Sequence, residues 1–137
     1  MHSIIQPAHS YLAWLALTLV ILSVVAALLS GSTFKNSYRK VARITLITVH
    51  IQLVLGLILY FTSPYGFSNL SGESMKDSFT RLLAVEHPFT NIIAIILITI
   101  GHAQSKRQDD GSRKILIFYG IGLLLLLSRI PWSTWLG

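Results

Sequence analysis

The chain has 137 residues and a net charge of +6; 53% of its residues are hydrophobic, 12% are charged and none is cysteine. Soluble domains carry about a quarter charged residues, and small ones bury only about 60–70% of their unfolded surface, so this composition excludes an ordinary soluble fold and indicates a membrane protein. The absence of cysteine excludes disulfides, iron–sulfur clusters and covalent c-type haem attachment.

Four segments are long and apolar enough to be membrane-spanning helices, which need about 20 mainly apolar residues. In chain order these segments are Tyr11–Leu29, Ile44–Phe61, Leu82–Gly101 and Ile115–Leu136. The residues before the first segment include no Lys or Arg, so this segment is interpreted as a helix and not as a signal peptide. We expect an all-α fold, in which residues 1–137 form a single four-helix transmembrane bundle with up-down topology.

The basic residues predict the orientation of this bundle. The first and third connections carry four basic residues each, namely Lys35, Arg39, Lys40 and Arg43, and Lys106, Arg107, Arg113 and Lys114. Cytoplasmic loops are enriched in Lys and Arg, so these connections are predicted to be cytoplasmic and both termini to lie outside. The expected location is the bacterial cytoplasmic (inner) membrane. Because the positive charge flanks apolar segments, it indicates membrane topology and not a nucleic-acid partner.

Small and weakly polar residues predict which helix faces turn inward, because they let membrane helices approach closely. On the first helix this stripe consists of His9, Ala13, Ala16, Val20, Ser23, Ala27 and Ser30. On the second it consists of Thr45, Thr48, Gln52 and Gly56, with His50 on roughly the opposite face. On the third it consists of His87, Thr90, Asn91, Ala94 and Gly101. On the fourth helix Phe118, Gly122, Leu126 and Arg129 share a face.

Proline at position 88 is expected to start or kink the third helix, because it cannot donate a backbone hydrogen bond. A kink would leave the carbonyl of Ala84 free, close to Glu86 and His87.

Five ionisable residues lie within or beside the expected spans, where such residues are costly and usually functional. They are His9, His50, Glu86, His87 and Arg129. Counted at about 1.5 Å per residue from the expected cytoplasmic helix ends, His50 lies roughly 10 Å deep and His9 roughly 30 Å deep. The other three lie roughly 20 Å deep by the same count. Glu86 and Arg129 therefore either form an ion pair between two helices or act separately, Arg129 on an anion and Glu86 on a histidine or a proton.

Imidazole is the usual axial ligand when a helix bundle holds b-type haem without cysteine. Helices one and three are diagonal in an up-down bundle, which favours His9 with His87 as the ligand pair; His50 with His87 is second. A height mismatch of about 10 Å counts against both pairs. Each histidine could instead hydrogen-bond between helices, or three histidines and Glu86 could bind a metal ion. His2 and His102 are expected to be solvated.

Four short stretches resemble a family of small bacterial four-helix membrane proteins that are labelled cytochrome b-like. These stretches are His9–Trp14, His50–Gly56, Val85–His87 and Ile130–Trp132. A more distant likeness is to one half of a haem A synthase, in which histidines on alternating helices hold haem. That likeness implies His9 and His87 as ligands. The chain has no second bundle, so haem A synthesis is not expected.

The leading hypothesis is a membrane b-type haem protein that transfers electrons, with His9 and His87 as iron ligands and His50 as reserve. Arg129 would pair with a haem propionate, Gln52 would line the site and Glu86 would orient a histidine. A quinol or a respiratory membrane complex would exchange electrons with it, and a second copy of the chain is a further expected partner. The alternatives are a cofactor-free accessory or assembly subunit and a metal- or quinone-dependent membrane enzyme built on Glu86, His87 and His50.

Overall fold

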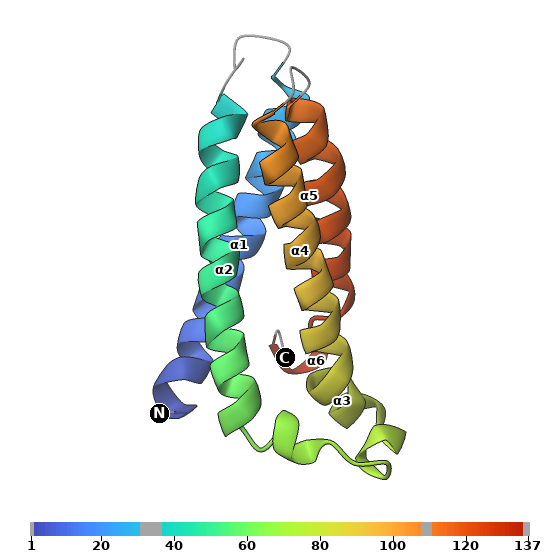
Figure 1. The fold of residues 1–137 in the computed structure, drawn as a ribbon. Helices are drawn as coiled ribbons and strands as arrows, with labels where there is room; N and C mark the ends of the chain where they lie inside the picture. The colour runs from blue at the N-terminus through green and yellow to red at the C-terminus, as the bar shows by residue number, and fades with distance from the viewer. Residues whose placement is uncertain (1, 31–36, 108–110, 136–137) are drawn as a thin grey trace.

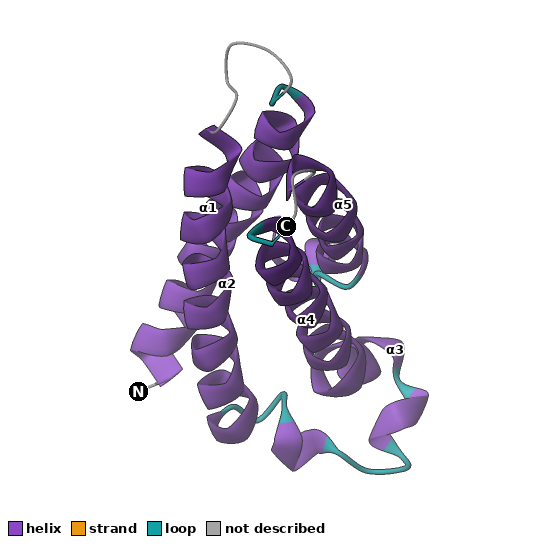
Figure 2. Cartoon of the chain, turned by 45° about the horizontal axis from the view of Figure 1, so that its top comes forward, coloured by secondary structure: helices purple, strands orange, loops and turns teal. Residues whose placement is uncertain are grey.

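The computed structural model describes residues 2–30, 37–107 and 111–135, and these residues are almost entirely helical (Figures 1 and 2). The long helices are α1 (His2–Leu28), α2 (Ser37–Thr62), α4 (His87–Ser105) and α5 (Gly111–Ser128). The short ones are η1 (Phe67–Asn69), η2 (Ser74–Lys76), α3 (Ser78–Arg81), the π-helical turn η3 (Leu82–Glu86) and α6 (Trp132–Trp135). Because α3, η3 and α4 follow one another without a break, they form one continuous span.

Four spans are long and apolar enough to cross a membrane, at Ser3–Leu28, Tyr38–Thr62, Ser78–Ser105 and Gly111–Ser128. The prediction of an all-α, four-helix transmembrane bundle is therefore confirmed, and the chain is a multi-pass membrane protein.

The helices alternate in direction around the bundle. α1 packs against α2 and α5, and α4 packs against α5 and α2, so α1 and α4 are diagonal to each other as predicted. The start of α1 and the long connection from α2 to α3 lie at one end of the bundle, which is the lower end in Figure 1. We call the opposite end the basic end, since the described residues Arg39, Lys40, Arg43, Lys106, Arg107, Arg113 and Lys114 belong to its helix termini.

The inward face predicted for α1 belongs to the core. Ala16, Val20, Ser23 and Ala27 of the α1 stripe are all at most 5% exposed. The hydroxyl of Ser23 lies 2.8 Å from that of Thr45, which also donates to the Leu19 carbonyl at 3.0 Å. Polar side chains in this core are thus paired across helices, as the low dielectric of the interior requires.

The contact between α4 and α5 depends on two glycines. A Cβ on Gly101 would overlap the Phe118 side chain, and a Cβ on Gly122 would lie 2.8 Å from Cγ1 of Ile98. The helices can approach this closely because neither glycine carries a side chain.

The expected helix boundaries need correction at several points. α1 begins at His2 and not at Tyr11, α2 begins at Ser37 and the third span reaches Ser105, so these helices extend beyond their most apolar parts. The fourth helix ends at Ser128, whereas the sequence predicted a span to Leu136, which lies outside the described residues. Pro131 explains the early end, because the residue before a proline disfavours helical geometry; the short helix α6 follows it.

Asp77 caps the start of the third span. Its carboxylate accepts hydrogen bonds from the Thr80 hydroxyl at 2.7 Å and from the Thr80 backbone N–H at 3.0 Å. These two bonds stabilise the charged form and lower the pKa of Asp77 below its ordinary value of 3.8. The cap therefore directs the chain from the connection into the membrane.

Candidate functional site

A cavity of about 550 Å³ lies in the half of the bundle away from the basic end. It is bordered by α1, α2 and the third span, and by residues around the start of α6 and of the α2–α3 connection, including Trp135 and Tyr65. Cavities of roughly 300–1,000 Å³ hold small molecules and cofactors in proteins, and most have apolar walls with a few polar groups. The polar groups here are concentrated around two histidines, His9 and His87.

The imidazole rings of His9 and His87 meet within this cavity. Their centroids are 6.4 Å apart and their planes are nearly perpendicular, at 85°. The expected height mismatch of about 10 Å is therefore wrong. His9 lies 19 residues before the end of α1 at Leu28, and His87 lies 18 residues before the end of α4 at Ser105. At about 1.5 Å per residue, both histidines are therefore about 27–29 Å from the basic end of the bundle. The error came from ending the third helix at Gly101.

His9 is positioned by two residues of α2. The Gln52 side-chain amide donates to the His9 backbone carbonyl at 2.8 Å, which ties the two helices together. A Cβ built on Gly56 would lie 3.1 Å from Cε1 of His9, so the imidazole packs closely against this glycine and would have to shift to admit a side chain there. The Nδ1 atom of His9 is buried and has no hydrogen-bond partner in the described part of the chain.

His87 is held from the other side of the cavity. Its Nδ1 lies 2.8 Å from the backbone carbonyl of Arg129, so Nδ1 carries the proton and donates it. That tautomer leaves Nε2 as the basic nitrogen. The Asn91 amide nitrogen lies 3.3 Å from Nε2 and can donate to it when no other group does. The Oδ1 atom of Asn91 and the Oε1 atom of Gln52 are also buried without a partner among the described residues.

The backbone before His87 is irregular, as the proline at position 88 predicted. The turn over Leu82–Glu86 is π-helical, and the Tyr60 hydroxyl donates to the Ala84 carbonyl at 2.8 Å. Tyr60 was not identified from the sequence. The free carbonyl itself was predictable, but its donor lies 24 residues earlier on another helix, where no local pattern marks it.

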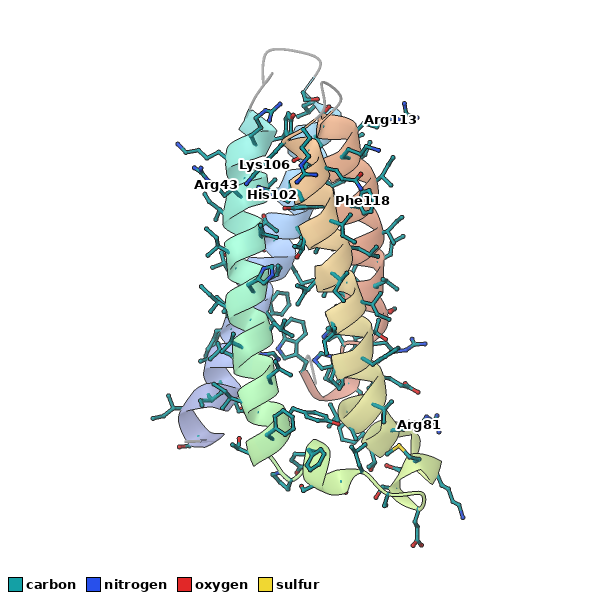
Figure 3. The ribbon with its side chains drawn as sticks, viewed as in Figure 1. Arg43, Arg81, His102, Lys106, Arg113 and Phe118 are labelled. Carbon is teal, nitrogen blue, oxygen red and sulfur yellow. The ribbon has the colours of Figure 1, made fainter. Side chains whose placement is uncertain are left out.

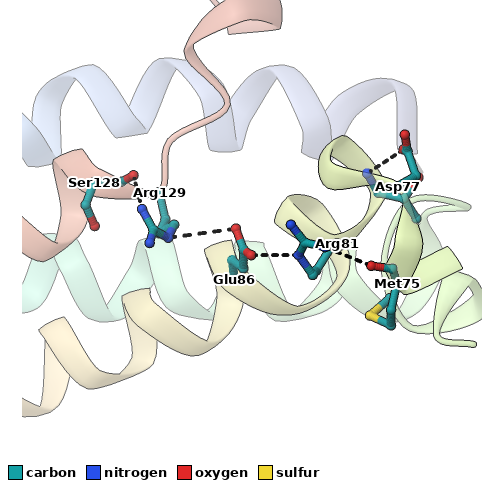
Figure 4. Close-up of polar contacts among 7 residues, drawn as sticks. Met75, Asp77, Arg81, Glu86, Ser128 and Arg129 are labelled. Carbon is teal, nitrogen blue, oxygen red and sulfur yellow. Dashed lines mark hydrogen bonds and ion pairs between the residues drawn. The ribbon is translucent and has the colours of Figure 1, made fainter. Parts of the chain in front are cut away.

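Glu86 points away from the cavity and joins two arginines (Figure 4). Its carboxylate lies 3.0 Å from Nε of Arg81 and 3.8 Å from Nε of Arg129. Of the two readings from the sequence, this geometry favours the ion pair with Arg129. These side chains are 34–48% exposed, so the pairs are not deeply buried. Arg129 contributes to the site through its backbone carbonyl, and its guanidinium is not part of the cavity wall.

His50 is not brought to the other two histidines. Its side chain is exposed on the outer face of α2, where Nδ1 lies 2.7 Å from the Leu46 carbonyl and Nε2 lies 3.5 Å from the Thr99 hydroxyl. In the described ranges no group of three His, Cys, Asp or Glu side chains gathers closely enough to hold a metal ion. A site built on Glu86, His87 and His50 together therefore has no geometric support.

The short helix α6 covers the cavity from the C-terminal side. The Trp135 indole N–H donates to the Ser10 hydroxyl at 2.6 Å, and its ring stacks on Trp14 with centroids 4.4 Å apart. Trp132 lies beside Trp135, at 5.7 Å between centroids. The contacts of Trp135 thus attach α6 to α1, and Trp135 forms part of the cavity wall.

Two imidazoles that come this close within one cavity have the separation needed to bind the two sides of one metal centre. With metal–nitrogen bonds of about 2 Å, such rings have centroids about 6 Å apart, close to the separation of His9 and His87. Comparison with known proteins adds no constraint, since no protein-family model, no curated protein and no solved structure matches the chain.

Proposed function

We propose that this chain is a membrane b-type haem protein that transfers electrons, with His9 and His87 as the two axial iron ligands. The observation that carries the proposal is the 6.4 Å separation of the two imidazole rings, which come from diagonal helices into one cavity. Ligands on diagonal helices approach a flat cofactor from opposite sides without requiring the bundle to open.

The surroundings of each histidine support this role. A histidine that binds a metal almost always donates its other ring N–H to a carbonyl or carboxylate, which fixes the ring and its tautomer. The Arg129 carbonyl serves His87 in this way and leaves Nε2 for the iron. The buried Nδ1 of His9 has no hydrogen-bond partner among the described residues, which is unfavourable unless a further group is bound.

The remaining walls suit a large apolar cofactor. Ala13, Ala16 and Gly56 are small, and they leave room beside His9 where longer side chains would fill the cavity. Gln52 also lines the cavity and would border the cofactor. Bound haem would supply one-electron oxidation and reduction of its iron. The protein would hold that iron in an apolar site and, through Trp135 and α6, limit the access of water.

Arg129 remains the proposed partner of a haem propionate, although its guanidinium now pairs with Glu86. Glu86 also binds Arg81 at a shorter distance, so it would stay neutralised if Arg129 turned toward a propionate. A quinol or a respiratory membrane complex remains the proposed electron partner, and the bacterial inner membrane remains the proposed location.

Optical spectra of the detergent-purified protein, oxidised and then reduced with dithionite, test the proposal. Six-coordinate b-type haem gives a Soret band and sharp α and β bands on reduction. A featureless spectrum, both as purified and after incubation with haem b, would reject it.

One observation favours a second candidate, a cofactor-free accessory subunit. Both ring nitrogens of His87 lie within hydrogen-bond distance of protein groups, Nδ1 of the Arg129 carbonyl and Nε2 of the Asn91 amide, so a purely structural role, joining α4 to the residues after α5, also accounts for this histidine. In that case the substitution His87→Ala would lower the free energy of unfolding of the bundle. Neither the wild-type protein nor this variant would show a haem spectrum.

A further inference from the structure

A second cavity, of about 380 Å³, lies at the basic end of the bundle, far from His9 and His87. It is lined by Arg39, Lys40, Ala42, Arg43, His102, Ser105 and Lys106. Figure 3 shows Arg43 of α2, His102 of α4 and Lys106, which directly follows α4, at this end of the bundle. We call this cavity the basic pocket.

The basic pocket is positively charged, and none of its lining residues is acidic. Of its four cationic side chains, none forms an ion pair with any residue in the described ranges; Arg39 only lies over the neighbouring Tyr38 ring. Like charges repel when they are held together, so this arrangement favours a bound anion. Asp109 and Asp110 follow Lys106 in sequence but lie outside the described residues.

His102 forms part of the pocket wall between the charged side chains. The sequence predicted a solvated histidine, but His102 is only 7% exposed, because α4 continues past it to Ser105 and α2 packs alongside. Its backbone carbonyl accepts the Ser105 hydroxyl at 2.7 Å. The pocket therefore has a buried imidazole and exposed cations at its rim.

The depth of the pocket matches that of lipid headgroups. α2 has 26 residues and is about 39 Å long, which exceeds the roughly 30 Å hydrocarbon layer by about two turns. Arg39, Lys40 and Arg43 lie in the first two turns of α2, and Lys106 directly follows α4. These cations are thus at the level where phospholipid phosphates lie.

We infer that the basic pocket binds the phosphate group of an anionic phospholipid. Arginine presents a planar fork of donors that fits phosphate oxygens, and lysine adds a compact charge. Basic pockets between transmembrane helices are a known setting for anionic lipid headgroups, whereas a phosphate ion from solution would lack the acyl chains that pack on the apolar faces of α2 and α4. The exposed side chains of Ile44 and Ile47 on α2 and Ile96 and Ile100 on α4 provide such faces.

Thermal unfolding of the purified full-length chain in detergent tests this inference, with phosphatidylglycerol, phosphatidylcholine or inorganic phosphate added in turn. We expect phosphatidylglycerol to raise the melting temperature at concentrations where the other two do not. In the variant R43Q/K106Q the lipid concentration needed for half of this shift should rise about 30-fold, since each basic residue contributes roughly fivefold. The control R113Q/K114Q removes the same charge from the same end but outside the pocket, and should shift the half-point less than threefold.

Three results would overturn the inference. Equal losses in the two variants would show that net charge and not the pocket attracts the lipid. An equal response to inorganic phosphate would assign the pocket to a soluble anion. The third result is that phosphatidylglycerol stabilises the wild-type protein no more than phosphatidylcholine does, but stabilises the variant D109N/D110N more. This result would show that the chain's own carboxylates fill the pocket. Melting temperatures without lipid show whether each variant folds.

Discussion

Tyr60 donates its hydroxyl proton to the one backbone carbonyl that Pro88 releases from the third span, at 2.8 Å from Ala84. A carbonyl without a partner inside a membrane costs more than one facing water, because no solvent can replace the lost bond. Tyr60 therefore allows the π-helical turn that precedes His87, and it fixes where His87 enters the cavity.

Replacing Tyr60 with Phe should lower the free energy of unfolding by about 1–3 kcal/mol, the usual cost of leaving a buried acceptor unpaired. Unfolding by SDS, followed by circular dichroism, measures this loss. Tyr65→Phe is the matched control, since the Tyr65 hydroxyl makes no hydrogen bond to a described residue and its side chain is 56% exposed. Equal effects of the two substitutions would contradict the role assigned to Tyr60.

Gly56 lies against the His9 ring, and its lack of a side chain leaves room for that ring. Gly56→Val would place its Cβ 3.1 Å from Cε1 of the His9 ring and add two methyl groups beyond it, and overpacking of this kind costs about 1–3 kcal/mol. We expect haem affinity to fall at least fivefold, measured by titration of the apoprotein with haem b. Gly120→Val makes the same change on α5 at a site with no atom within 4 Å, so its affinity should stay within twofold of the wild type.

At the scale of elements, α4 and α5 form a closely packed pair whose separation is set by Gly101 and Gly122. α1 and α2 are joined differently, by hydrogen bonds between Ser23, Thr45 and the Leu19 carbonyl. Helix pairs of both kinds are common in membranes, where packing and polar contacts replace the hydrophobic effect. The cavity lies between these two pairs, so changes in either pair should alter its width.

Gly101→Ala should destabilise the α4–α5 pair by about 1–3 kcal/mol, because the added methyl group overlaps Phe118 and lies 3.4 Å from the Lys114 carbonyl oxygen. Gly120→Ala should instead stabilise the protein by about 0.5–1 kcal/mol, since it only removes the conformational freedom of a helical glycine. Unfolding by SDS compares the two. If Gly101→Ala is as stable as Gly120→Ala, the close approach of α4 and α5 is wrong.

At the scale of the whole molecule, the bundle has two chemically different ends, one with His9 and His87 and one with the basic pocket. The helical period of small residues predicted the inward face of α1, where Ala16, Ser23 and Ala27 are spaced by seven and four residues and are all buried, and it also placed His50 on roughly the opposite face of α2 from Thr45. The meeting of His9 with His87 was obscured by an error of four residues at the end of the third helix. Helix ends in a membrane continue into the headgroup region, so hydropathy alone does not locate them.

Neither Tyr60 nor Trp135 could be assigned to the site from the sequence. Tyr60 acts on a carbonyl of another helix, and Trp135 reaches Ser10 across 125 residues of chain. Contacts of this kind depend on how the helices are arranged, and no local pattern of residues encodes them.

The most direct test of the account is the amount of haem b bound per chain in the variants His9→Ala, His87→Ala and His50→Ala, measured from the spectrum of the reduced pyridine complex, together with the coordination of that haem, measured from the optical spectrum of the intact protein. We predict that His9→Ala and His87→Ala each lose most of the haem or change it from six- to five-coordinate, while His50→Ala binds as much as the wild type. Unaltered haem binding in both His9→Ala and His87→Ala, or a loss confined to His50→Ala, would contradict the assignment of the two facing imidazoles as the ligand pair.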